Sequence, residues 1–142
     1  MVHDCGIVLD PTLVEGQVHG GVVQGIGNTL FEELLVSPDG HLLNASLWDC
    51  AIPTINDVLR INVLHIETAS PFNPLGVKGA GESGCIPVAA ALAQGIEDAL
   101  SAKNIEVLSI SVTPHKLFAI WEHRRQQEKG CSPLLAPDTL RR

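Results

Sequence analysis

Apolar residues recur along the chain at two spacings, and these spacings predict its helices and strands. Between residues 14 and 35 an apolar residue returns every fourth position, which is typical of one face of an α-helix. This stripe consists of Val18, Val22, Ile26, Leu30 and Leu34. A second helix is predicted over 87–102, with a proline in its first turn. A short third helix is predicted from the Thr113-Pro114 pair through Trp121.

Four other segments have the composition and alternation of strands. They are 2–9, 41–48, 58–67 and 105–112, and the third alternates most regularly. Helical and strand-like segments mixed in this way predict an α+β fold, with helices packed on a mixed β-sheet.

The sequence changes character near its C-terminus. From Glu122 it becomes polar, and it is interrupted by Gly130, Pro133 and Pro137. We therefore expect one domain over 1–121 and a loosely ordered tail over 122–142.

Nine of the thirteen glycines lie in two short stretches, 16–27 and 76–84. A glycine inside a helix costs about 0.5–1 kcal/mol relative to alanine, so five within the first helix predict that another segment packs closely against it. Two surfaces of close approach in one small domain suggest a shared, tightly held ligand.

A polar but uncharged stripe follows the same helix. It consists of Gln17, Gly21, Gln24 and Asn28. Carboxamides both donate and accept hydrogen bonds and could hold a flat ligand. The alternative, favoured on residue types alone, is a helix face in contact with solvent.

The segment 76–84, Gly-Val-Lys-Gly-Ala-Gly-Glu-Ser-Gly, carries one carboxylate, Glu82, on a backbone with few side chains. It precedes the predicted helix 87–102, whose N-terminus favours anions. Glu82 is therefore a candidate acid or base beside a bound anion, although a glutamate in a turn is often only a surface carboxylate.

Residues 79–84 also match the pattern G-x-G-x-x-G of dinucleotide-binding folds. That pattern requires a strand leading directly into the first glycine and an acidic residue at the end of the next strand. Here Pro71 and Pro74 precede the glycines, and the next predicted strand ends in Ser111-Val112. The context therefore argues against a nicotinamide-dinucleotide site.

Composition excludes some classes of function. The net charge is −7, with 4 Lys/Arg against 13 Asp/Glu in residues 1–121, which argues against nucleic acid as a partner. The sequence has no long apolar run and no signal-peptide pattern, so we expect a cytoplasmic protein. Hydrophobic residues make up 45% of the chain, which predicts apolar surface for a partner subunit to cover.

The four cysteines are widely spaced, at positions 5, 50, 85 and 131. No pair has the spacing of a zinc or iron–sulfur site. We expect reduced, mostly buried thiols, with Cys85 a candidate for lining a site because it adjoins the glycine-rich segment.

Two long motifs, residues 16–27 and 74–84, resemble the xanthine dehydrogenase / aldehyde oxidase / carbon monoxide dehydrogenase family of molybdenum hydroxylases. Shorter matches in the same order are Asp4-Cys5-Gly6, residues 49–54 and Thr113-Pro114. The resemblance covers about residues 2–121 and is to the C-terminal part of the large, molybdopterin-binding subunit.

The resemblance implies an enzyme that oxidises an aldehyde, an N-heteroaromatic or a similar small substrate, with water as the oxygen source. It implies a molybdenum-pterin cofactor, in the form of molybdopterin cytosine dinucleotide, and Glu82 as general base. The implied cofactor-binding residues are Gln17, Gln24, Gly25, Lys78, Gly79, Ala80 and Gly81. FAD and 2Fe–2S clusters are expected on separate partner subunits.

A large subunit of this family is several times longer than 142 residues, and the loops that select substrate lie in its N-terminal half. We therefore expect this chain to complete its site with the rest of a large subunit. The alternative is a non-catalytic remnant that only packs against a partner.

Overall fold

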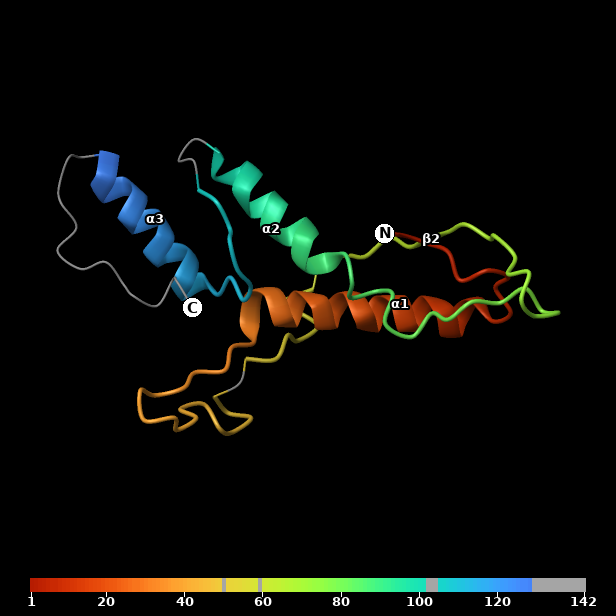
Figure 1. Cartoon of the computed structure of the whole chain (residues 1–142), viewed down its shortest axis with the longest axis horizontal. Coiled ribbons are helices and arrows are strands. Elements are labelled where there is room, and N and C mark those ends of the chain that lie inside the picture. The colour runs from red at the N-terminus through yellow and green to blue at the C-terminus, as the bar shows by residue number, and fades with distance from the viewer. Residues whose placement is uncertain (50, 59, 102–104, 129–142) are drawn as a thin grey trace.

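The computed structural model describes residues 1–49, 51–58, 60–101 and 105–128. Within these residues the regular structure consists mainly of three α-helices, α1 (Pro11–Ile26), α2 (Val88–Ala99) and α3 (Pro114–Glu128). A π-helical turn, η1 (Gly27–Phe31), continues α1 directly. Two short strands, β1 (Val2–His3) and β2 (Leu64–His65), complete the set. In Figure 1, α1 lies along the long axis of the molecule and α2 slants away from its middle.

Helix α1 begins earlier and ends earlier than the predicted range 14–35. The Asp10 carboxylate caps it by accepting hydrogen bonds from the amides of Thr12 (3.0 Å) and Leu13 (3.1 Å), and Pro11 occupies the first turn. After Phe31 the backbone is extended. Asn44 bonds the amide of Leu35 (2.9 Å) and the carbonyl of Glu33, so its side chain takes the place of helical partners there.

The prediction of close approach to the first helix is confirmed for its later glycines. A Cβ atom on Gly21 would lie 2.9 Å from the Cα of Gly84, and one on Gly25 would lie 2.6 Å from the Cβ of Val88. The second contact packs the start of α2 directly on α1. Gly16 and Gly20 have no neighbour within 4 Å of such a Cβ, so close packing does not explain them.

The predicted mixed sheet is not formed by the described residues. β1 pairs in parallel with β2, with Val2 opposite Leu64 and His3 opposite His65, and only these parts of the predicted strands 2–9 and 58–67 are regular. The strand predictions for 41–48 and 105–112 are wrong. In the latter segment the amide of Val107 bonds the Glu97 carboxylate (2.7 Å) and that of Val112 bonds the Thr29 carbonyl (2.5 Å), so neither pairs with a strand.

Helix α3 runs to Glu128, beyond its predicted end at Trp121. Residues 122–128 of the predicted tail are therefore helical, and the rest of that tail lies outside the described residues. In α3 the guanidinium of Arg125 lies 5.3 Å from the centre of the Trp121 ring. This cation–π contact, one turn apart, favours continuation of the helix.

The core is small and much apolar surface is exposed. Val18 and Thr29 are fully buried, and the Thr29 hydroxyl donates to the Gly25 carbonyl (2.6 Å). More than half of the surface is exposed for many large apolar residues, among them Leu9, Leu13, Leu34, Leu47, Trp48, Ile55, Phe72, Ile86 and Leu108. Among the described residues, no helix is both long and apolar enough to cross a membrane.

Candidate functional site

The glycine-rich segment 76–84 runs beside α1 and touches its backbone at the far end (Figure 1). A Cβ on Gly84 would lie 2.6 Å from the carbonyl oxygen of Val18 and 3.1 Å from the Cα of Gly21. Only glycines on both sides allow two backbones to come this close. The contact fixes the distance between the segment that carries Glu82 and the helix that carries the glutamines.

Residues 5–7 hold the first part of this segment. The Ile7 amide donates to the Gly76 carbonyl (3.1 Å), and the Lys78 amide donates to the Cys5 carbonyl (2.8 Å). Gly6, between them, forms an antiparallel bridge with Val77 and has a φ of +71°. The backbone of the N-terminal segment thus pairs with residues 76–78.

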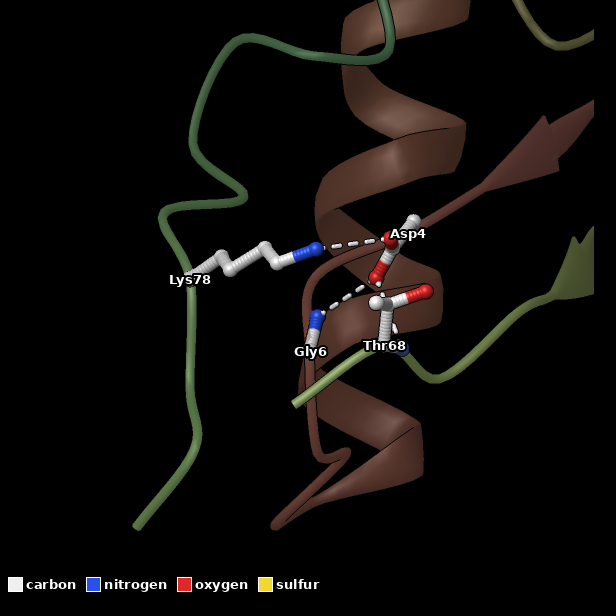
Figure 2. Close-up of polar contacts among 4 residues, drawn as sticks. All are labelled: Asp4, Gly6, Thr68 and Lys78. Carbon is white, nitrogen blue, oxygen red and sulfur yellow. Dashed lines mark hydrogen bonds and ion pairs between the residues drawn. The ribbon is translucent and has the colours of Figure 1, made fainter. Parts of the chain in front are cut away.

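An ion pair strengthens the same junction. The Lys78 ammonium lies 2.7 Å from Asp4 Oδ2, while Asp4 Oδ1 accepts hydrogen bonds from the amides of Gly6 (2.8 Å) and Thr68 (3.3 Å) (Figure 2). The hydrogen bond from Lys78, followed by that from Gly6, holds the pKa of the Asp4 carboxyl well below its usual range. The Lys78 side chain, predicted to bind cofactor, is therefore directed to Asp4.

His3 holds the other end of the segment. Its Nε2 lies 2.7 Å from the Ser83 hydroxyl, which also donates to the Ala80 carbonyl (3.2 Å). The amide and thiol of Cys85 both lie 3.1 Å from the Glu82 carbonyl oxygen. The backbone on both sides of Glu82 is therefore tied by hydrogen bonds.

Between these two anchored ends, the central residues are open. Gly79, Gly81 and Glu82 are exposed and Ala80 is half-buried, and a Cβ on Gly79 or Gly81 would meet nothing within 4 Å. Within the part of the chain that the structure describes, the amides of residues 79–81 form no backbone hydrogen bond. The segment presents bare backbone and one carboxylate.

The glutamines of α1 are also exposed, and they flank the contact between the segment and the helix. Gln17 and Gln24 lie four and three residues from Gly21, so all three share one face of the helix. Gly25 lies to the other side of Gly21 and is covered by Val88. The exposed glutamines therefore share a helix face with Gly21, the residue that contacts Gly84, whereas Gly25 is enclosed in the α1–α2 contact.

The opposite face of α1 borders an open groove of about 1110 Å³. Its lining includes Glu15, His19, Val23 and residues 60–64, and contains none of the predicted site residues. Hollow volume alone therefore does not identify the site.

Among the described residues, no three His, Cys, Asp or Glu side chains gather as a metal-binding group. Cys5 and Cys85 are free thiols, buried and half-buried respectively. Cys50 and Cys131 lie outside the described residues.

Sequence reasoning did not identify His3 and Ser83 as parts of this arrangement. Ser83 lies within the glycine-rich motif, but His3 is separated from it by 80 residues and carries no local signal. Asp4 has a sequence signal only as part of the Asp4-Cys5-Gly6 match.

Comparison with known proteins shows which family this chain resembles. Residues 1–59 match the family model of the molybdopterin cofactor-binding domain. Over 82% of its length, the chain is 44% identical to the nicotine 6-hydroxylase large subunit of Paenarthrobacter nicotinovorans. It is 37% identical, again over 82% of the chain, to a putative xanthine dehydrogenase molybdenum-binding subunit of Escherichia coli.

Among solved structures, quinoline 2-oxidoreductase from Pseudomonas putida 86 superposes with a TM-score of 0.83 and 41% sequence identity, over 87% of this chain. The chain spans only 14–16% of the length of these three proteins. It is thus similar to one portion of a much larger polypeptide. With two glycine-rich segments in contact, a molybdopterin-domain match and these relatives, the chain belongs to the molybdopterin-binding large subunits of the xanthine dehydrogenase / aldehyde oxidase / carbon monoxide dehydrogenase family of molybdenum hydroxylases.

Proposed function

We propose that this chain supplies one side of the molybdenum-cofactor site in a molybdenum hydroxylase, with Glu82 as the general base. The observation that carries the proposal is the contact between Gly21 and Gly84, which brings the anchored segment of Glu82 against the glutamine-bearing face of α1. An exposed carboxylate on a fixed backbone can accept a proton from a nucleophile placed beside it.

The residues present suit a pterin cofactor. Among the described residues the backbone N–H groups of Gly79, Ala80 and Gly81 have no backbone partner, so they are free to donate to the oxygen atoms of an anionic ligand. Gln17 and Gln24 add exposed carboxamides that can donate and accept hydrogen bonds. The cytosine dinucleotide form of the cofactor is part of this proposal.

When bound, the molybdenum cofactor supplies two-electron redox chemistry. This chain's own share is to bind and orient the cofactor through residues 79–81 and the two glutamines. A carboxylate oxygen of Glu82 accepts a proton from the water-derived nucleophile. A neutral hydroxyl must lose this proton in order to attack carbon.

The substrate is proposed to be a small N-heteroaromatic compound, with aldehydes as the second class. Two of the relatives described above are named for nicotine and quinoline, both nitrogen heterocycles. One further relative, 38% identical, is named as a subunit of a dehydrogenase complex. We propose that the rest of a large subunit covers the exposed apolar surface, and that FAD and 2Fe–2S subunits carry electrons away.

The test is Glu82→Gln in the assembled, molybdenum-loaded complex. We expect loss of turnover by at least about a hundredfold, the lower end of what a general base contributes, with molybdenum and pterin content unchanged. Glu106→Gln, at another exposed glutamate, is the matched control and should retain activity.

Near-normal turnover of the Glu82→Gln complex would refute the role of base. A chain that never acquires molybdenum or a pterin in any complex would instead favour the non-catalytic remnant. The geometry does not favour the nicotinamide alternative, because a turn over 71–75 and an isolated bridge at Val77, rather than a strand, lead into Gly79.

A further inference from the structure

The most unusual polar group in the described residues is the His3 side chain. Only 7% of His3 is exposed, and its Nδ1 atom is buried without a hydrogen-bond partner among the residues described. Burial of a ring nitrogen without a hydrogen-bond partner costs free energy. We therefore expect the hydrogen bond made by the other ring nitrogen, Nε2, to offset that cost. That bond goes to Ser83, the residue that follows Glu82.

The hydrogen-bond directions follow from a count of protons. Ser83 has one hydroxyl proton, and the Ala80 carbonyl, which can only accept, lies 3.2 Å from that oxygen. If Ser83 donates to Ala80, then Nε2–H of His3 donates to Ser83, and only a lone pair at Nδ1 is left unmatched. The other tautomer would bury an unpaired N–H group, which folded proteins tolerate less well.

We propose that His3 is a positioning residue for Glu82. The chain of hydrogen bonds from His3 through Ser83 to the Ala80 carbonyl closes the turn that contains Glu82. Removal of the His3 donor frees the Ser83 hydroxyl to rotate, so the turn loses its hydrogen bond to the N-terminal strand. His3 itself stays in place through its backbone, whose carbonyl accepts from Ile66 (2.9 Å) in the β1–β2 pair.

The test uses two nearly isosteric substitutions in the full chain. The amide nitrogen of glutamine is as many bonds from Cα as Nε2 of histidine, whereas that of asparagine matches Nδ1. His3→Gln can therefore keep the donor to Ser83, and His3→Asn cannot. Both side chains are neutral and polar, so a difference between them reports the hydrogen bond rather than the loss of an aromatic ring alone.

The first readout is hydrogen exchange, which does not depend on activity. In His3→Asn, we expect the Cys85 amide, bonded to the Glu82 carbonyl, to exchange about tenfold faster, as expected for loss of one partly buried hydrogen bond. The Lys78 amide, bonded to Cys5, should be unaffected. In His3→Gln both amides should exchange within about twofold of the parent chain. His41→Ala, at an exposed histidine that follows the turn 38–40, is the control for histidine loss.

Equal exchange rates of the Cys85 amide in His3→Asn and His3→Gln would overturn the inference. Equal acceleration of the Lys78 and Cys85 amides in His3→Asn would also overturn it, because it would mean that the whole N-terminal segment detaches. Long-range nitrogen–proton NMR should also show the His3 proton on Nε2, and a proton on Nδ1 would contradict the proposed directions.

The consequence for catalysis rests on the proposed function and is measured separately. In the assembled complex, His3→Asn should lower kcat about tenfold, with KM and molybdenum content unchanged, and His3→Gln should restore most of the loss. If Glu82→Gln remains active, the proposed function fails while the exchange result is unaffected. If Glu82→Gln is inactive and His3→Asn is fully active, the positioning role is wrong.

Discussion

The backbones of Gly21 and Gly84 touch, so that a Cβ atom on Gly21 would lie 2.9 Å from the Cα of Gly84 and 3.0 Å from the Cys85 amide nitrogen. These residues are 63 positions apart in the sequence, and both lack the side chain that would separate them. Because neither glycine has a side chain, the helix and the segment that carries Glu82 can pack with their backbones in direct contact.

Gly21→Ala should destabilise the chain, because the clash is with backbone that cannot rotate away. Overpacking of this kind costs about 1–3 kcal/mol. Gly20→Ala, one residue earlier with nothing within 4 Å, is the matched control and should stabilise the chain by about 0.5–1 kcal/mol through helix propensity. Urea unfolding followed by circular dichroism measures both. Equal and stabilising effects would show that the contact is not tight in solution.

Gly6→Ala should be more damaging than Gly40→Ala. Both glycines have positive φ, +71° and +86°, which alone costs a residue with a Cβ about 1–2 kcal/mol. At Gly40 nothing else lies within 4 Å, whereas a Cβ on Gly6 would lie 2.2 Å from the Gly76 carbonyl oxygen. We expect Gly40→Ala to show the conformational cost only. Gly6→Ala should also accelerate exchange of the Lys78 amide, and unchanged exchange there would contradict the pairing of these segments.

The Asp4–Lys78 ion pair predicts a stability that depends on pH. Its hydrogen bonds hold the folded-state pKa of Asp4 below the ordinary value of about 3.9. A carboxyl with a lowered folded-state pKa contributes stability above its unfolded pKa, and loses it as pH falls through the folded value. Asp4→Asn should therefore lower the urea midpoint at pH 7, and the difference from the parent chain should shrink as the pH falls below about 4.

The control for this comparison is Asp39→Asn, an exposed aspartate in the turn after Ser37. It should leave the midpoint nearly unchanged at both pH values. Because Asp4 is a surface group, added salt should also reduce its effect at pH 7. A difference between Asp4→Asn and the parent chain that is constant from pH 7 to pH 2.5 would rule out the ion pair as its cause.

The helices could be predicted from the sequence because their signals are local. The four-residue apolar spacing predicted α1, although not its start at Asp10-Pro11, and the stretch after Pro87 predicted α2. The end of α1 was missed because Asn44, eleven residues beyond Glu33, provides the competing hydrogen bonds. The strands were overpredicted because alternation shows that a segment can pair, but not that a partner strand lies beside it.

The candidate site was also predictable only where its signals are local in the sequence. Clustered glycines indicated two backbones in close contact, and the Gly21–Gly84 contact confirms this. The resemblance, rather than the spacing of residues, pointed to Glu82 and the glutamines, and their roles stay predictions. The contacts of His3 and Asp4 with the segment could not be predicted, since they join residues 74 or more positions apart.

Residues 76–84 are tied at both ends by contacts made within this chain, while their middle remains open to the outside. A molecule that settles on residues 79–82 therefore meets a backbone already in order. Ordering the backbone of one flexible residue costs about 1–2 kcal/mol of conformational entropy. Here the backbone is already ordered in the folded chain, so ligand binding does not incur this cost. Preorganisation of this kind leaves more of the contact energy available as affinity, so we expect this part of the proposed site to need no rearrangement during assembly.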